Sequence, residues 1–238
     1  MNNRPTRHSY SSIKLWERCP AAWRMKYIDR LPEAPPGKAA KRGTRLHIAA
    51  EKYLKDEIPL DKLPVEYHPF EASLKYAKSM GGQAESVWLC GPDWQPVWPT
   101  ADGKEPPMTW LKAIIDLSYV VNDELYIVDF KSGQVYRDHD AQLELYMIIG
   151  AARYPNVKAV HATAWYLDKT VEGRHFRHEH PWLTALRGPW TEKICAIEGD
   201  ELFPKTPSIP NCRFCQFAQS RGGPCDMEFR DESYAKKA

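Results

Sequence analysis

Hydrophobic and polar positions are most regular between residues 110 and 146. Apolar side chains dominate 110–121 and 124–131, and the Asn122-Asp123 pair between them is a turn sequence. We therefore predict two adjacent strands joined by a tight turn. The same reasoning predicts strands over 83–90, 159–167 and 174–180, while helical spacing of apolar residues predicts helices from about Thr44 and over 138–153 and 182–197. This order predicts an α/β fold with a mixed sheet.

The N-terminal segment has its own helical pattern. Residues 9–30 predict a short helix capped by Ser11 or Ser12, which Pro20 interrupts before a second helix begins. Residues 31–43 are rich in Pro, Gly and basic residues and are predicted to be a loop.

Both central strands carry a carboxylate where the pattern requires a hydrophobic side chain. Asp116 and Asp129 each interrupt an apolar run, and a buried carboxylate must be paired, hydrogen-bonded or bound to a metal. Lys131 follows Asp129 on the same face, because strand side chains alternate. Two acids and a lysine at the ends of neighbouring strands indicate a divalent-metal phosphodiesterase site. A structural salt bridge between Asp129 and Lys131 is the alternative.

Further polar residues fall on predicted elements near these strands. His47 lies early in the helix predicted from Thr44, four residues after Gly43, and can be a structural residue or a ligand. Gln142 and Tyr146 share one face of the helix over 138–153, because they are four residues apart. Glu85, on the strand over 83–90, is a further candidate for the same site.

Length and composition limit the class of protein. The chain has 238 residues and a net charge of +2, and it is predicted to form one domain: an N-terminal helical segment (1–40), a core (41–200) and a C-terminal tail (201–238). No apolar run reaches the roughly 20 residues that span a bilayer. A polar N-terminus without a signal-peptide pattern predicts a cytoplasmic protein of a bacterium or a phage-infected cell, with reduced cysteines.

Charge is distributed unevenly along the chain. Residues 1–50 contain eleven Lys and Arg against three acids, a net +8, so the remainder carries −6. A basic segment with interleaved aromatic residues suits a polyanion such as nucleic acid. A solvated helical face is the alternative.

The cysteines form a pattern of their own. Cys212-x-x-Cys215 and Cys225 are three thiols in one Pro- and Gly-containing stretch, and Cys19 is the candidate for a fourth ligand. Such a set can hold zinc or a 4Fe–4S cluster. Cys90 and Cys195 are predicted to be core residues.

Four motifs, taken in order, resemble the RecB-like branch of the PD-(D/E)XK nuclease superfamily. They are Gly43-x-x-x-His47, Asp116 after its apolar run, Asp129-Phe130-Lys131, and Gln142-x-x-x-Tyr146. This branch includes the CRISPR-associated exonuclease of the Cas-four type, the AddB nuclease domain and phage exonucleases. The resemblance extends over nearly the whole chain. It implies a restriction-endonuclease-like mixed sheet flanked by helices, with a metal site of four cysteines joining the N-terminal helices to the C-terminal tail.

The resemblance also implies roles for individual residues. Mg²⁺ or Mn²⁺ would be held by a set of four groups: His47, Asp116, Asp129 and the backbone carbonyl of Phe130. Lys131 would orient the attacking water and stabilise the transition state, with Gln142 and Tyr146 holding Lys131 or the DNA backbone. Basic residues of the preceding segment would contact DNA: Lys38, Lys41, Arg42 and Arg45. The cysteines Cys19, Cys212, Cys215 and Cys225 would bind a 4Fe–4S cluster, with zinc as the alternative, although the gap between Cys215 and Cys225 is longer than usual.

The implied activity is metal-dependent hydrolysis of phosphodiester bonds from DNA ends, with single-stranded DNA or DNA ends as the partner. A structure-specific endonuclease and a CRISPR spacer-processing nuclease are alternatives of the same class. A non-catalytic DNA-end-binding subunit is an alternative of another class. Recombination, repair or CRISPR adaptation would supply any partner protein, and no membrane association is expected.

Overall fold

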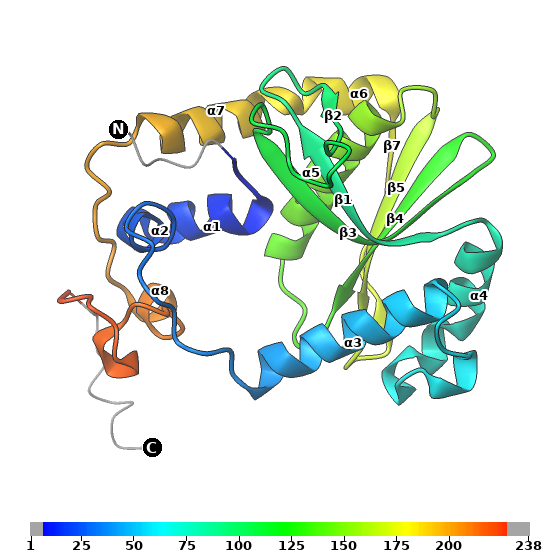
Figure 1. Cartoon of the computed structure of the whole chain (residues 1–238), viewed down its shortest axis with the longest axis horizontal. Coiled ribbons are helices and arrows are strands. Elements are labelled where there is room, and N and C mark those ends of the chain that lie inside the picture. Colours follow the sequence, from blue (N-terminus) through cyan, green and yellow to red (C-terminus); the bar gives the residue numbers. More distant parts are fainter. Residues whose placement is uncertain (1–6, 228–238) are drawn as a thin grey trace. The chain divides into compact units, whose positions relative to one another are not determined.

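The computed structural model describes residues 7–227, which fall into two compact units (Figure 1). The first unit comprises the described parts of Met1–Pro35 and Thr191–Ala238, and the second is Pro36–Trp190. No helix within residues 7–227 has the length and apolar composition needed to cross a membrane.

A mixed sheet of seven strands lies at the centre of the second unit. Its strands are β1 (Gln83–Cys90), β2 (Pro96–Val97), β3 (Leu111–Val121), β4 (Glu124–Lys131), β5 (Ala159–Tyr166), β6 (Val171–Glu172) and β7 (Phe176–Glu179). The order is β2-β1-β3-β4-β5-β6, with β7 also paired to β5. Strands β4 and β5 are parallel and the other pairs in this sheet are antiparallel. Helix α5 (Asp138–Arg153) connects β4 to β5, since parallel neighbours need a crossover. The mixed α/β fold is thus confirmed.

Helices cover both faces of this sheet (Figure 1). Helix α5 lies so close to one face that a Cβ added at Gly150 would be 2.8 Å from Leu125 Cδ2. The opposite face is covered by α3 (Lys38–Leu54), η1 (Leu60–Lys62), η2 (Val65–Phe70) and α4 (Glu71–Ser79). There Leu46 and Phe70 join Phe130 in a buried hydrophobic cluster. The central strands are therefore apolar on both faces. The buried carboxylates of Asp116 and Asp129 are exceptions to this pattern.

Strands β3 and β4 part before they end. Their pairing extends from Val121↔Glu124 to Leu117↔Val128 and stops there, although β3 begins at Leu111 and β4 continues to Lys131. At the point of separation the Asp116 carboxylate accepts a hydrogen bond of 2.6 Å from the backbone N–H of Phe130. A side chain thus replaces a ladder partner, and the opening between the strands is lined with polar groups.

The first unit is mainly helical. It contains α1 (Tyr10–Arg18), α2 (Pro20–Tyr27), α8 (Ile209–Cys212) and η3 (Gln219–Arg221). Trp23 is 1% exposed and stacks on Phe203 with ring centroids 5.8 Å apart. The backbone N–H of Ala21 donates to the Pro204 carbonyl. The N-terminal helices and the segment near residue 204 therefore share one core.

Several predicted helix boundaries were wrong. Helix α3 begins at Lys38 rather than Thr44, which lies inside the helix and donates its hydroxyl to the Ala40 carbonyl. Lys, Ala and Arg are strong helix formers, so residues 38–43 of the predicted loop are helical, whereas 31–37 have no regular secondary structure, as predicted. The cap of α1 is Ser9 rather than Ser11 or Ser12.

The helix predicted over 182–197 is broken into α6 (His180–Ala185) and α7 (Arg187–Gly199). Pro189 falls in the first turn of α7, where a missing N–H costs nothing, whereas in a continuous helix it would remove a hydrogen bond. Cys90 is buried as predicted, but Cys195 is exposed and not a core residue.

Candidate active site

Three ligand-bearing side chains converge where β3 and β4 part. His47 from α3, Glu85 from β1 and Asp116 from β3 bring one ligand atom each within 4.8 Å of one another. His47 Nδ1 lies 3.2 Å from Asp116 Oδ1 and 3.4 Å from Glu85 Oε1. Adjacent ligands of an octahedral ion with bonds of ~2.1 Å are about 3 Å apart. The spacing therefore fits a divalent cation.

Glycine at position 43 brings α3 close to the end of β4. A Cβ at Gly43 would lie 2.8 Å from Ser132 Oγ, so only glycine fits without a shift. His47 follows one helical turn later, and its Nε2 donates a hydrogen bond of 3.0 Å to the Phe130 carbonyl. Metal-binding histidines commonly donate their second ring nitrogen to a carbonyl in this way. The hydrogen bond leaves Nδ1 facing the two carboxylates, and the carbonyl retains a second lone pair.

Glu85 occupies a strained backbone position. Its φ is +48°, although it lies within β1, and the neighbouring pairs Ala84↔Leu117 and Ser86↔Ile115 place it opposite Asp116. A left-handed conformation in a non-glycine residue is unfavourable and often accompanies a functional site. Here it coincides with the convergence of the Glu85 carboxylate on His47 and Asp116.

Asp129 belongs to a second hydrogen-bonded group beside these three residues. Lys131 Nζ lies 2.7 Å from Asp129 Oδ2 and donates to Gln142 Oε1 at 2.8 Å. Gln142 Nε2 donates to the Tyr146 hydroxyl at 2.6 Å and to Asp129 Oδ1 at 3.3 Å. The two pairs on β4 and α5 therefore form one chain of polar contacts. Asp129 is outside the group of three that lies within 4.8 Å.

The carboxylates of the site shift the pKa values of His47 and Asp129. Burial works against a charged His47, but hydrogen bonds with Asp116 and Glu85 raise its pKa to about 10. Burial and the nearby Asp116 carboxylate raise the pKa of Asp129, and Lys131 opposes that shift. Like-charged carboxylates at such range favour protons or a bound cation. The carboxylate oxygens suit Mg²⁺ or Mn²⁺, and the imidazole fits Mn²⁺ better than Mg²⁺.

A histidine–tyrosine pair near Lys131 was missed by the sequence reasoning. His139 Nδ1 and the Tyr166 hydroxyl are 3.0 Å apart, and Lys131 pairs with Tyr166 across β4 and β5. Burial, followed by the charge of Lys131, lowers the pKa of His139 to about 4. His139 lies three residues before Gln142 on the same helical face, and this spacing is the signal that could have identified it.

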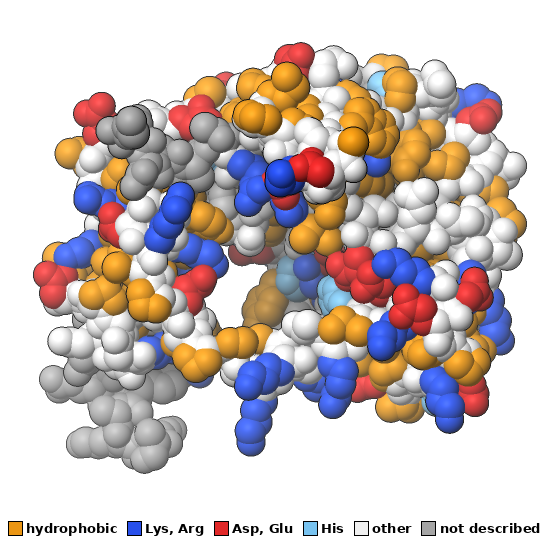
Figure 2. All heavy atoms as spheres, viewed as in Figure 1, with side chains coloured by type: hydrophobic (Ala, Val, Ile, Leu, Met, Phe, Trp, Pro, Cys, Tyr) orange, Lys and Arg blue, Asp and Glu red, His pale blue; other side chains and the backbone are white. Residues whose placement is uncertain are grey.

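The four basic residues proposed for DNA contact differ in their surroundings. The guanidinium nitrogens of Arg42 lie 2.6 Å from a Glu66 carboxylate oxygen and 2.5 Å from an Asp168 carboxylate oxygen. Arg42 is therefore already paired with two acidic residues of the protein. Lys38, Lys41 and Arg45 are exposed on α3, and Figure 2 shows Lys and Arg side chains projecting along this helix.

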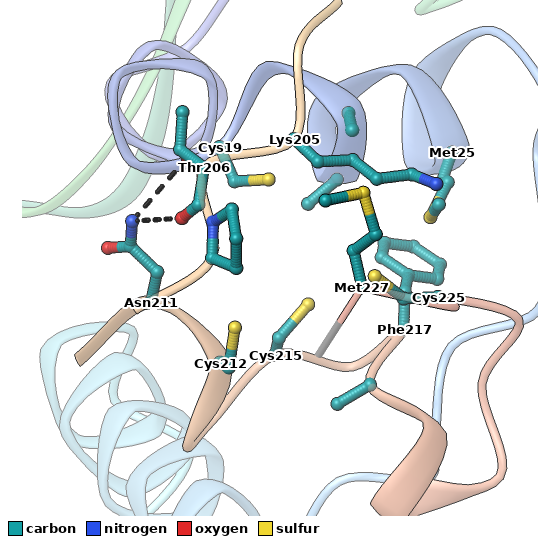
Figure 3. Close-up of a pocket in the computed structure, with 14 residues that line it drawn as sticks. Cys19, Met25, Lys205, Thr206, Asn211, Cys212, Cys215, Phe217, Cys225 and Met227 are labelled. Carbon is teal, nitrogen blue, oxygen red and sulfur yellow. Dashed lines mark hydrogen bonds between the residues drawn. The ribbon is translucent and has the colours of Figure 1, made fainter. Parts of the chain in front are cut away.

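The four predicted cysteine ligands line a single cavity in the first unit. In Figure 3 the sulfur atoms of Cys19, Cys212, Cys215 and Cys225 point toward a shared space. Burial is the main cause that raises the pKa of Cys215, and the nearby Cys19 and Cys225 raise it further. Within residues 7–227 the group of three ligand atoms closer than 4.8 Å is that of His47, so no three thiols are this close.

Comparisons with known proteins agree with this geometry. Residues 7–220 match the family model of the PD-(D/E)XK nuclease superfamily. A crystal structure from Eubacterium rectale, named as a candidate exonuclease, is similar with a TM-score of 0.50 and 13% identity, covering 97% of this chain and 92% of that one. The protein SSO0001 is similar with a TM-score of 0.51 and 12% identity, covering 95% and 89%. At such identities these structures show the fold alone. No curated protein matches the sequence.

Proposed function

Because the chain belongs to the PD-(D/E)XK nuclease superfamily, we propose that it is a metal-dependent DNA exonuclease of the RecB-like branch. The observation that carries this proposal is the convergence of His47, Glu85 and Asp116 beside the Asp129–Lys131 pair. The choice of DNA ends over internal sites follows the resemblance of the four sequence motifs to the RecB-like branch, and a structure named as a candidate exonuclease shares the fold.

His47, Glu85 and Asp116 would hold the divalent cation, with the Phe130 carbonyl and Asp129 as neighbouring oxygen donors. When bound, the cation lowers the pKa of water and offsets charge on the scissile phosphate. Asp129 is turned toward Lys131 in this structure, so its carboxylate would serve both the Lys131 ammonium and the cation.

Lys131 provides the positive charge that stabilises the developing negative charge on the phosphate. Gln142 holds the ammonium in place through its carbonyl oxygen at 2.8 Å, and Tyr146 fixes the amide of Gln142. Positive charge that is already oriented in a partly buried site requires little reorganisation during the reaction. Tyr146 is 7% exposed and is therefore a positioning residue rather than a group that contacts DNA.

Exposed cations on α3 would bind the DNA backbone. Lys38, Lys41 and Arg45 lie three or four residues apart and share one helical face. Each phosphate neutralised by such a residue contributes to salt-dependent affinity. Arg42 is paired with Glu66 and Asp168 and is left out of this proposed surface.

A 4Fe–4S cluster is proposed for the cysteine-lined cavity. Four thiolates can hold either a single zinc ion or a 4Fe–4S cluster, and the resemblance to the RecB-like branch favours the cluster. Iron and sulfide analysis of protein purified without oxygen tests this choice, because stoichiometric zinc in a colourless protein contradicts it.

The experiment for the main proposal uses end-labelled linear single- and double-stranded DNA and a circular single strand, with Mn²⁺, Mg²⁺ or EDTA. We expect metal-dependent release of nucleotides from linear DNA and no cleavage of the circle. Cleavage of the circle favours an endonuclease, including a spacer-processing nuclease. Binding without turnover in any metal favours a non-catalytic DNA-end-binding subunit.

A further inference from the structure

The first unit contains a second pocket, distinct from the thiol cavity. It has a volume of about 300 Å³ and is lined by residues of α1, α2 and the loop after α8, among them Arg18, Lys26, Tyr27, Phe214 and Gln216. The two cavities have Cys215 and Phe217 in common. None of the residues that line this pocket belongs to the proposed active site.

Phe214 gives the pocket an aromatic surface that solvent can reach. Its side chain is 59% exposed, and two guanidinium groups lie over its ring, Arg213 at 5.1 Å and Arg221 at 6.0 Å. Aromatic rings and guanidinium planes both stack on nucleic-acid bases. An exposed phenylalanine flanked by two arginines therefore has the composition of a base-stacking surface.

Positively charged residues also line the pocket and suit a phosphate. Arg18 is exposed at the end of α1 and makes no ion pair with any residue that the structure describes. Lys26 is paired with Glu33 at 2.9 Å, so Arg18 is the stronger candidate for a phosphate. Aromatic and cationic groups therefore face the same small volume.

We propose that this pocket binds one base and an adjacent phosphate of single-stranded DNA, with Phe214 as the stacking residue and Arg18 as the phosphate contact. The choice of DNA rests on the proposed nuclease function. A pocket near the lower end of the size range for ligand sites holds a nucleotide unit, whereas a paired base in a duplex cannot reach a ring at its wall. The site is therefore selective for single strands.

The test measures affinity of the full chain for fluorescein-labelled oligothymidylate in EDTA, where no cleavage interferes. Phe214→Ala should weaken binding about 5- to 140-fold, the loss expected for one base–aromatic stack. Phe214→Trp should retain binding, because indole also stacks. Leu202→Ala is the matched control, since Leu202 is 86% exposed in the same unit and lies outside the pocket.

Arg18→Ala is tested by salt dependence. Loss of one phosphate contact should reduce the slope of log affinity against log salt by about 0.7. Lys52→Ala, an exposed cation of α3, is expected to leave the slope closer to that of the wild type. A 2-aminopurine oligonucleotide should be quenched by the wild type and less by Phe214→Ala, which separates stacking from a change in folding.

Equal affinities of Phe214→Ala and Leu202→Ala, or no binding by the wild type, would overturn the proposal. Blunt duplex DNA should bind Phe214→Ala and the wild type alike, and a loss for the duplex as well contradicts selectivity for single strands. Mn²⁺-dependent cleavage of the same oligonucleotide tests the nuclease function separately. If the oligonucleotide stacks on Phe214 but is not cleaved, the proposed base-binding pocket is supported and only the proposed nuclease activity is refuted.

Discussion

The ammonium of Lys131 lies 2.7 Å from the carboxylate of Asp129, two residues earlier on β4. Asp129 is 3% exposed, so its charge depends on this neighbour and on Gln142. The same ammonium is proposed to act on the phosphate. The Asp129–Lys131 ion pair therefore contributes both to the stability of the fold and to the proposed catalysis. Mutations of the two residues should separate these two contributions.

Lys131→Met should abolish detectable cleavage and destabilise the fold. Removing one partner of a buried ion pair costs roughly 3–5 kcal/mol, and here protonation of Asp129 reduces that cost. Asp129→Asn combined with Lys131→Met should recover most of the stability in urea unfolding and none of the activity. Recovery of turnover in the double variant contradicts the role of Lys131.

Gly43→Ala should be coupled to Ser132. In a helix this change normally stabilises by about 0.5–1 kcal/mol, but here the new Cβ meets Ser132 Oγ at 2.8 Å. The gain should therefore be reduced or reversed in the wild-type background and restored in Ser132→Ala. The free energies of unfolding of the four proteins form a double-mutant cycle. Additivity within error shows that the close approach carries no energetic weight.

Stability at acid pH should depend on His139. Burial lowers its folded-state pKa to about 4, whereas in the unfolded chain it titrates near ~6.5. The unfolded state therefore binds the additional proton between these values, and this stabilising contribution, complete above pH ~6.5, is lost as pH falls toward 4. Urea midpoints of the wild type should fall more steeply over this window than those of His139→Gln. Parallel curves mean that another group dominates.

Much of the sheet was predictable, because alternation and apolar runs determine strands directly. Residues 83–90 and 124–131 form β1 and β4 as predicted, and 138–153 forms α5. Asp116 and Asp129 stood out because a carboxylate within an apolar run has few structural explanations. The Pro and Gly residues before Lys38 predict a loop, but the helix propensity of the residues that follow prevails in the folded chain.

Other features depend on tertiary geometry that no local pattern contains. The positive φ of Glu85 and the early separation of β3 from β4 both occur beside Asp116 in the folded chain. The His139–Tyr166 contact joins α5 to the end of β5. The sequence around Phe214 does not distinguish it from other aromatic residues. Its proposed role depends on the pocket that it lines and on the two arginines near its ring.

Titration with Mn²⁺, followed by calorimetry in the absence of DNA, tests the central claim most directly. We predict that the wild type binds Mn²⁺ at this site and that Asp116→Asn weakens the affinity by about tenfold or more. Lys52→Ala, on the same helix as His47, serves as the control and should bind like the wild type. Equal Mn²⁺ affinity in Asp116→Asn and the wild type would contradict a cation held by His47, Glu85 and Asp116.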